Sequence, residues 1–137
     1  MEKVKIEGRE YDVKYTSGFP IPSGMKGIVL MKRIYIDKEW AKDPGSLEHE
    51  AVHVRQQERD GWWRFAFRYV FDKDWRLDYE ARAYAHQAVV FANGDMNLLG
   101  TVERTYATFL YGNYHLGKEY AVVLDTIQRY VNAELSG

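Results

Sequence analysis

The chain has 137 residues, enough for one compact domain, and it has no cysteine, which excludes disulfide bonds, thiolate metal ligands and a cysteine nucleophile. Its formal net charge of −1 argues against a partner held by bulk charge attraction, such as nucleic acid or an anionic membrane. Hydrophobic residues at 46% and charged residues at 28% are ordinary values for a globular domain with a buried core.

The first forty residues have the pattern of β-strands. Apolar side chains alternate with polar ones in two runs, Val4 and Ile6, then Tyr11, Val13 and Tyr15. The stretch 7–10 between these runs is expected to be a hairpin turn, and two prolines make residues 19–24 a loop. Residues 28–31 and 34–36 form a second extended pair. We therefore expect a small mixed sheet in this part of the chain.

From Asp43 onward the apolar spacing is helical. Asp43 and Pro44 predict the N-cap and first residue of a helix that runs to about Arg59 and ends at Asp60-Gly61. Four more helices are expected, at residues 62–71, 74–92, 98–111 and 116–135, with Asp74 capping the longest of them. The predicted fold class is α+β, with one domain spanning residues 1–137 and the sheet preceding the packed helices.

Residues 62–71 combine aromatic rings with two arginines, Arg64 and Arg68. Such a composition suits a helix that lies in a membrane interface, and it also suits a helix packed on the domain. Because only two positive charges mark its polar face, we favour packing across the back of the two main helices, with both arginines facing water.

The sequence His49-Glu50-Ala51-Val52-His53 lies inside the first predicted helix. Residues four apart on a helix lie about 40° apart in azimuth and roughly 6 Å apart along the axis, so both imidazoles can bind one ion. Zn²⁺ accepts imidazole nitrogens at about 2.0–2.1 Å. Glu50 lies about 100° around from His49, which places it to take a proton from a metal-activated water rather than to bind the metal. Such a pattern also arises by chance on ordinary helices, but the apolar residues around it favour a buried metal site.

A catalytic zinc ion needs a third protein ligand and an open position for water. Position 56 is glutamine and position 59 is arginine, so the extended motif with a glycine and a third histidine is absent. The downstream candidates are Asp72, Asp74, Asp78, Glu80, His86 and His115. Glu80 is favoured because the short helix can bring the next long helix back antiparallel, and the small residues beside Glu80 allow close approach. Asp74 and Asp78 are better explained as helix-terminal acids, and His86 faces another side of the helix.

The His-Glu-x-x-His motif followed by Glu80-Ala81-Arg82-Ala83 resembles the gluzincin group of zinc metallopeptidases. The resemblance covers roughly residues 28–92, and residues 47–57 are similar to compact single-domain members, including minimal gluzincins and short metallopeptidase-like proteins of bacteria and phages. It implies a zincin-like fold in which the first long helix is the active-site helix, and one zinc ion held by His49, His53 and Glu80. It also implies an extended substrate lying antiparallel to an edge strand, here residues 34–36.

Peptide hydrolysis also needs a hydrogen-bond donor for the developing oxyanion. Tyr84 lies one turn after Glu80 on the same face, and His115 is the second choice; the alternatives are Tyr106, Tyr111 and Tyr114. Each tyrosine is more often a packing residue. The candidates for a carboxylate that holds the second nitrogen of a ligand histidine are Asp78 and Glu103.

The expected function is zinc-dependent hydrolysis of peptide bonds in a peptide, a protein or the peptide part of a cell wall, with Glu50 as general base. One alternative is a catalytically silent binding or structural protein on a zincin scaffold, although an intact Glu50 argues against decay. Another is a latent enzyme in which Glu119 or Glu134 supplies a fourth ligand. No nucleic-acid or membrane partner is expected. The first residues lack the apolar run of a signal peptide, so we expect a cytoplasmic protein, or one released without a recognisable signal.

Overall fold

The computed structural model describes residues 1–137, which form one four-stranded sheet followed by five α-helices. The strands are β1 (Glu2–Ile6), β2 (Arg9–Tyr15), β3 (Gly27–Leu30) and β4 (Arg33–Ile36). The helices are α1 (Ser46–Asp60), α2 (Trp62–Phe71), α3 (Lys73–Ala92), α4 (Met96–Asn113) and α5 (Tyr120–Ser136), with a short 3₁₀ turn, η1 (Trp40–Lys42), before α1. The α+β class is confirmed. None of the helices combines the length and the apolar composition needed to cross a bilayer.

The sheet has the strand order β1-β2-β4-β3. Two hairpins, β1–β2 and β3–β4, are each antiparallel, and β2 pairs with β4 in parallel, so the sheet is mixed as expected. The prediction that residues 34–36 form an edge was wrong, because Ile34 pairs with Val13 on one side and Val29 on the other. The loop between β2 and β3 is long enough to bring β4 beside β2, and the two edge strands are therefore β1 and β3.

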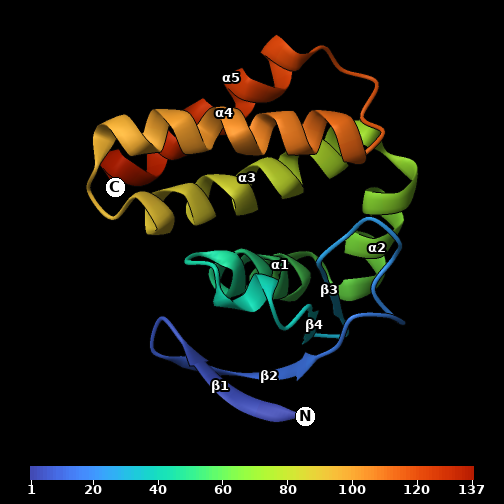
Figure 1. Cartoon of the computed structure of the whole chain (residues 1–137). Coiled ribbons are helices and arrows are strands. Elements are labelled where there is room, and N and C mark those ends of the chain that lie inside the picture. The colour runs from blue at the N-terminus through green and yellow to red at the C-terminus, as the bar shows by residue number, and fades with distance from the viewer.

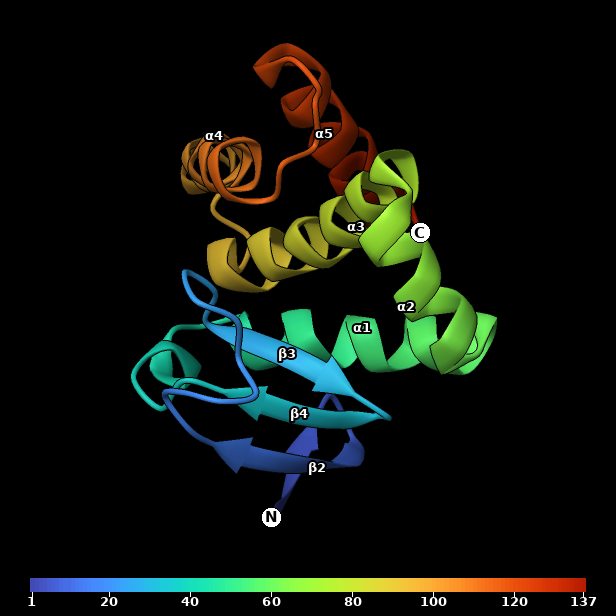
Figure 2. The same ribbon diagram turned by 90° about the vertical axis from the view of Figure 1, so that its right-hand side faces the viewer.

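Helix α1 lies between two hydrophobic layers (Figures 1 and 2). On one side, Ala51 and Val54 pack against buried strand residues such as Val13 and Ile34. The second layer is built from α3, α4 and α5, where a row of alanines in α3 allows the helices to approach closely. The chain colours in Figure 2 show α3 running back across α1 in the opposite direction. Because both sides of α1 are covered, its polar residues His49, Glu50 and His53 are buried.

The prediction that α1 begins at Asp43-Pro44 was wrong by two residues. Asp43 has an extended backbone and ends the 3₁₀ turn η1, and the N-cap of α1 is Gly45. The hydroxyl of Ser46 donates to the carbonyl oxygens of Trp40 and Asp43, at 2.8 Å each, so side-chain bonding stabilises this tight entry. Gly45 has φ of +89°, and a Cβ there would lie 2.7 Å from the carbonyl oxygen of Gln87 in α3. Only glycine fits this position, which sets how closely α1 and α3 meet.

Replacing Gly45 with alanine is therefore expected to destabilise the fold by about 2–4 kcal/mol, because left-handed strain adds to a backbone clash. Gly94 is a matched control, since it has φ of +91° and no neighbour within 4 Å of an added Cβ. Gly94→Ala should lower the free energy of unfolding by about 1 kcal/mol, because only the left-handed backbone strain remains. Urea unfolding of both variants measures the difference, and equal losses would show that the approach of α1 to α3 tolerates a methyl group.

Other helix boundaries also differ from those predicted, and α4 begins at Met96, two residues earlier than expected. The N-cap of α3 is Asp72, whose carboxylate accepts from the amides of Asp74 and Trp75, so Asp74 lies in the first turn. Helix α4 continues through Gly112 to Asn113, and α5 begins at Tyr120, four residues later than expected. In contrast, the ends of α1 and α2 lie where the breakers Gly61 and Asp72 predict them.

Candidate metal centre

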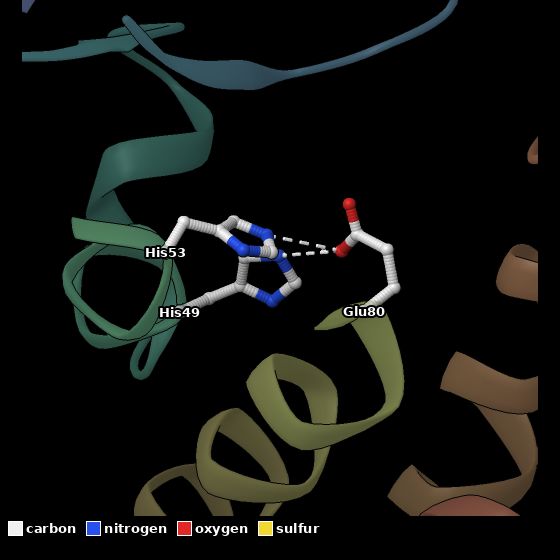
Figure 3. A group of neighbouring side chains, drawn as sticks. All are labelled: His49, His53 and Glu80. Atoms are coloured by element: carbon white, nitrogen blue, oxygen red, sulfur yellow. Dashed lines mark hydrogen bonds and ion pairs between the residues drawn. The ribbon is translucent and has the colours of Figure 1, made fainter. Parts of the chain in front are cut away.

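Three side chains from two helices meet between the layers (Figure 3). The Nε2 atoms of His49 and His53 lie 3.2 and 3.1 Å from the same carboxylate oxygen, Oε1 of Glu80. One nitrogen from each imidazole and one oxygen of Glu80 all lie within 4.8 Å of one another. All three side chains are buried, with no more than 5% of any residue exposed. The structure therefore brings together the ligands predicted from the motif and from α3.

The spacing of these atoms fits a zinc ion. In tetrahedral coordination with bonds of about 2.0–2.1 Å, neighbouring ligand atoms are separated by roughly 3.3 Å. The two nitrogen–oxygen distances in the cluster lie close to that value. Two imidazole nitrogens and one carboxylate oxygen are also the donor set of several catalytic zinc sites. The cluster can thus hold zinc with little movement of its side chains.

The charges of the cluster also suit a cation. Burial would raise the pKa of Glu80, but the imidazoles of His53 and His49 outweigh this and hold the pKa of that carboxyl far below its usual range. Burial opposes a charge on His53, but the Glu80 carboxylate raises the pKa of His53 to about 9. Glu80 is therefore anionic at every physiological pH, which is the form that binds a metal.

Glu50 places a second carboxylate beside the cluster. It follows His49 on α1, is 2% exposed, and lies against β3, where a Cβ on Gly27 would be 3.0 Å from the Glu50 carboxyl carbon. Glycine at position 27 thus leaves the space that this carboxylate occupies. Burial raises the pKa of Glu50, and the neighbouring imidazoles only partly oppose it. Glu50 therefore binds a proton more readily than an exposed glutamate does.

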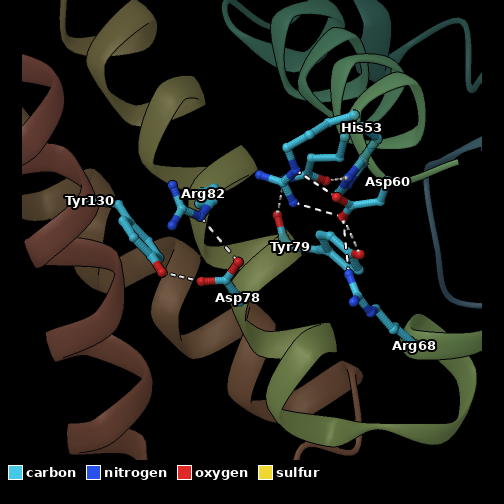
Figure 4. A network of polar contacts seen from close by, with 9 residues as sticks. His53, Asp60, Arg68, Asp78, Tyr79, Arg82 and Tyr130 are labelled. Atoms are coloured by element: carbon cyan, nitrogen blue, oxygen red, sulfur yellow. Dashed lines mark hydrogen bonds and ion pairs between the residues drawn. The ribbon is translucent and has the colours of Figure 1, made fainter. Parts of the chain in front are cut away.

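Gln56 fixes the orientation of one ligand ring. Its amide nitrogen donates to the carbonyl oxygen of Tyr79, at 3.1 Å, which turns the amide oxygen toward Nδ1 of His53, at 2.8 Å. Since that oxygen and the carboxylate of Glu80 can only accept, both ring nitrogens of His53 carry a proton while no metal is bound, in agreement with its raised pKa, and Nε2 must lose its proton to bind a metal. The expected partners Asp78 and Glu103 do not orient this ring. Asp78 instead accepts from Arg82 and from the hydroxyl of Tyr130 on α5 (Figure 4).

A polar network holds the helices that carry the ligands (Figure 4). The hydroxyl of Tyr79 on α3 donates to Asp60 at the end of α1, at 2.6 Å. Arg59 also bonds this carboxylate, and Arg68 of α2 lies 3.5 Å from it. Arg68 thus pairs with Asp60 instead of facing water as predicted. The ends of α1, α2 and α3 are tied together at Asp60, which limits relative movement of the two ligand-bearing helices.

Tyr69 of α2 orients the carboxylate of Glu80. Its hydroxyl donates to Oε2 of Glu80 at 2.5 Å, leaving Oε1 to face the imidazoles. Burial and then the Glu80 carboxylate raise the pKa of Tyr69 well above its usual value, so the hydroxyl keeps its proton. The guanidinium of Arg76 binds the carbonyl oxygens of Tyr69 and Val70 and so fastens this end of α2 to α3. A residue from the short aromatic helix therefore belongs to the centre.

The variant Tyr69→Phe is expected to weaken zinc binding about 10- to 100-fold, because the carboxylate of Glu80 loses the bond that orients it. Tyr79→Phe removes another hydroxyl that bonds a carboxylate, Asp60, which does not belong to the cluster. It should leave zinc affinity nearly unchanged. Competition with a zinc-binding dye measures both variants, and equal affinities for Tyr69→Phe and wild type would show that Glu80 needs no such support.

The two residues predicted as oxyanion donors lie in different places. The ring of Tyr84 packs on that of His49, with centroids 4.4 Å apart, and its hydroxyl lies 2.9 Å from that of Tyr114. His115 is exposed in the connection between α4 and α5, and it does not line the cavity that contains the cluster. The structure therefore does not bring His115 to the centre.

The cluster opens into a cavity of about 620 Å³. One side is formed by the edge strand β3, another by α2 and a third by α4, and 15 of the 24 lining residues are hydrophobic. A cavity of this size accommodates a short segment of an extended chain or a small molecule. The cluster therefore lies where a ligand can reach it, beside an edge strand whose outer backbone groups are not paired with another strand.

His86 and the acids considered as a fourth ligand lie elsewhere. The two ring nitrogens of His86 bond Glu134 of α5 and Glu7 of the β1–β2 turn, and Glu119 precedes α5 at its N-cap. Neither Glu119 nor Glu134 reaches the cluster. The hydrogen bond to Glu134, with a contribution from Glu7, raises the pKa of His86 to about 9 against the effect of burial.

A raised pKa means that protonated His86 stabilises the fold below its unfolded value of about 6.5, and that this contribution disappears as the pH rises through 9. His86→Gln is therefore expected to lower the free energy of unfolding by about 1 kcal/mol at pH 6, allowing for solvent screening of this partly exposed group. The difference should fade by pH 10. Urea unfolding at the two pH values tests this, and a difference that does not change with pH would contradict it.

Five of the six residues predicted for the site line one cavity, and they are His49, Glu50, His53, Glu80 and Tyr84. Sequence reasoning missed Gln56, Tyr69 and Gly27, which orient or make room for them. No family model, no curated protein and no solved structure matches the chain.

Proposed function

We propose that the chain is a zincin-like metallopeptidase of the gluzincin type, in which His49, His53 and Glu80 hold one zinc ion. The observation that carries this proposal is the buried group of two imidazole nitrogens and one carboxylate oxygen, all within 4.8 Å of one another, which opens into a cavity lined by an edge strand. When bound, the ion acts as a Lewis acid that polarises a carbonyl group and makes a water molecule acidic near neutral pH.

Glu50 is the general base in this proposal. Its carboxylate takes a proton from the water that attacks the peptide carbonyl carbon, and it returns the proton to the amine nitrogen as the carbon–nitrogen bond breaks. The raised pKa of Glu50 suits both steps, because the group must accept a proton and then release it. Tyr84, which lines the same cavity, is our candidate donor to the oxyanion that forms between these steps.

The substrate is proposed to be a peptide, from a protein or from a cell wall, bound in extended form along β3. Residues Gly27–Leu30 line the cavity, and β3 pairs on one side only, with β4. A peptide that adds to this edge would bond to the free backbone groups and pass the cluster.

The alternative is a silent protein that binds zinc or a peptide without cleaving it. Glu50 favours catalysis over this alternative. Burying its carboxylate costs free energy, and a purely structural metal site would not need a carboxylate that does not bind the metal. The raised pKa of its carboxyl reflects that cost.

A direct test incubates the zinc-loaded protein with a mixed peptide library and with purified cell-wall peptides, and mass spectrometry detects new termini. We expect cleavage that stops when a chelator removes the zinc and returns when zinc is restored. A protein that holds one zinc ion and cleaves neither substrate class would favour the silent alternative.

A further inference from the structure

Helix α2 packs on the domain along only one side. Phe65 is its single buried residue, and four large apolar side chains are more than half exposed. These are Trp63 (73%), Phe67 (65%), Val70 (58%) and Phe71 (74%). At 100° per residue they cover an arc of about 100°. The helix therefore packs on the domain with one face, as predicted, while its opposite face is apolar and exposed to solvent.

The apolar face continues beyond α2. Leu30 and Met31 of the β3–β4 turn are 41% and 64% exposed, and both line the cavity together with Trp62 and Val70. Figure 2 shows α2 and the β3–β4 turn on the same side of the molecule. We call the exposed apolar residues of α2 and of this turn the aromatic face. The cavity opens beside it, and patches of this kind on a single chain mark interaction sites.

The segments that form this face are strongly basic. Residues 16–36 and 60–73 carry six cationic side chains and two carboxylates, a net charge of +4, although the whole chain has −1. Five of the six have no carboxylate within 4.0 Å, and they are Lys26, Lys32, Arg33, Arg64 and Lys73. Of the two carboxylates, Asp60 pairs with Arg68 and Asp72 caps α3. The cations are therefore available to an anionic partner.

From this charge segregation we infer that the aromatic face docks on the surface of an anionic lipid bilayer. Tryptophan and phenylalanine side chains insert at the boundary of headgroups and acyl chains, while lysine and arginine bind lipid phosphates. The net charge of −1 and the two arginines of residues 62–71 alone predict no membrane partner. The fold changes this, because Lys26 lines the same cavity as α2, and Lys32 belongs to the β3–β4 turn whose Met31 lines that cavity.

A second copy of the chain fits this face less well. An isologous contact would place two segments of net positive charge against each other, which is repulsive. Docking on lipid requires neither zinc nor catalysis, so the inference stands apart from the proposed function. If both hold, the mouth of the cavity lies next to the bilayer, and the substrate is a peptide at the membrane surface.

Co-sedimentation of the full chain with vesicles tests the inference. We expect binding to an equal mixture of phosphatidylglycerol and phosphatidylcholine, little binding to phosphatidylcholine alone, and weaker binding as salt is raised. The double variant Phe67→Ser/Phe71→Ser should lower the partition coefficient by roughly tenfold or more, since two exposed rings are lost. Arg64→Gln should lower it several-fold.

The matched controls lie on α5. Val122→Ser/Leu135→Ser removes two half-exposed apolar side chains, and Arg129→Gln removes one exposed cation. Both should bind vesicles like wild type, and unchanged urea midpoints would show that all variants remain folded. The inference fails if wild type binds neither vesicle, if both vesicles bind equally, or if the α2 variants bind like the controls. It also fails if light scattering shows a dimer that Phe67→Ser/Phe71→Ser abolishes while vesicle binding is absent.

Discussion

Glu50→Gln is expected to retain one zinc ion per chain and to lower kcat by roughly 10²- to 10⁴-fold, because general base catalysis usually contributes a factor of that size. Glutamine keeps the shape of the side chain against Gly27 but cannot accept the proton from the attacking water. Because Glu50 is not one of the three clustered ligands, the metal site should keep its composition. Zinc content by elemental analysis and cleavage of the best library peptide are measured on the same sample.

Glu48→Gln is the matched control for this variant. It makes the same change two residues earlier on α1, at a position outside the cavity. This control should cleave like wild type. If Glu50→Gln cleaves at the wild-type rate, Glu50 is not the base. If it loses zinc instead, its carboxylate contributes to metal binding and the assignment of ligands must change.

Glu80→Ala is expected to weaken zinc binding roughly 10²- to 10³-fold, because one ligand contributes about a quarter of the 10–16 kcal/mol typical of a four-ligand structural zinc. The change leaves Nε2 of His53 and the hydroxyl of Tyr69 without their shared partner. The metal-free variant should therefore also be less stable, by about 1–3 kcal/mol. Titration with zinc against a chelating dye gives the affinity, and urea unfolding gives the stability.

Asp78→Ala is the control on the same helix. Asp78 was a candidate ligand from sequence, but it bonds Arg82 and Tyr130 in the structure. This variant should bind zinc like wild type while losing some stability. Wild-type affinity in Glu80→Ala, with circular dichroism showing an intact fold, would remove Glu80 from the centre.

The part of the fold that sequence predicts well is local. Helix α2 ends at Asp72 as predicted, and α1 ends at Gly61, because breakers act through their own backbone preferences. The start of α1 and the order of the strands depend on distant partners. Gly45 begins α1 where α3 leaves no room for a Cβ, and β4 becomes a central strand because it pairs with β2 across a long loop. Neither contact is visible in a local pattern.

The site follows the same division. The two histidines and Glu50 come from one helical turn, whose geometry fixes their relative positions, and they could be predicted from spacing alone. Tyr69 could not, because an aromatic helix offers several rings and only the packed fold selects the one that reaches Glu80. Gln56 carried a usable signal, since it lies one turn after His53 on the same face. A histidine such as His115 can donate a hydrogen bond to an oxyanion. Its place in the sequence, however, does not determine whether it lies near the cluster in the fold.

The central claim is that one metal ion binds His49, His53 and Glu80. A crystal of the protein grown with zinc, with diffraction data collected on both sides of the zinc absorption edge, tests this most directly. We predict one strong anomalous peak about 2.0–2.2 Å from Nε2 of both histidines and from a carboxylate oxygen of Glu80. A well-ordered crystal of the zinc-treated protein with no peak there, or with its only peak at other side chains, would contradict the account.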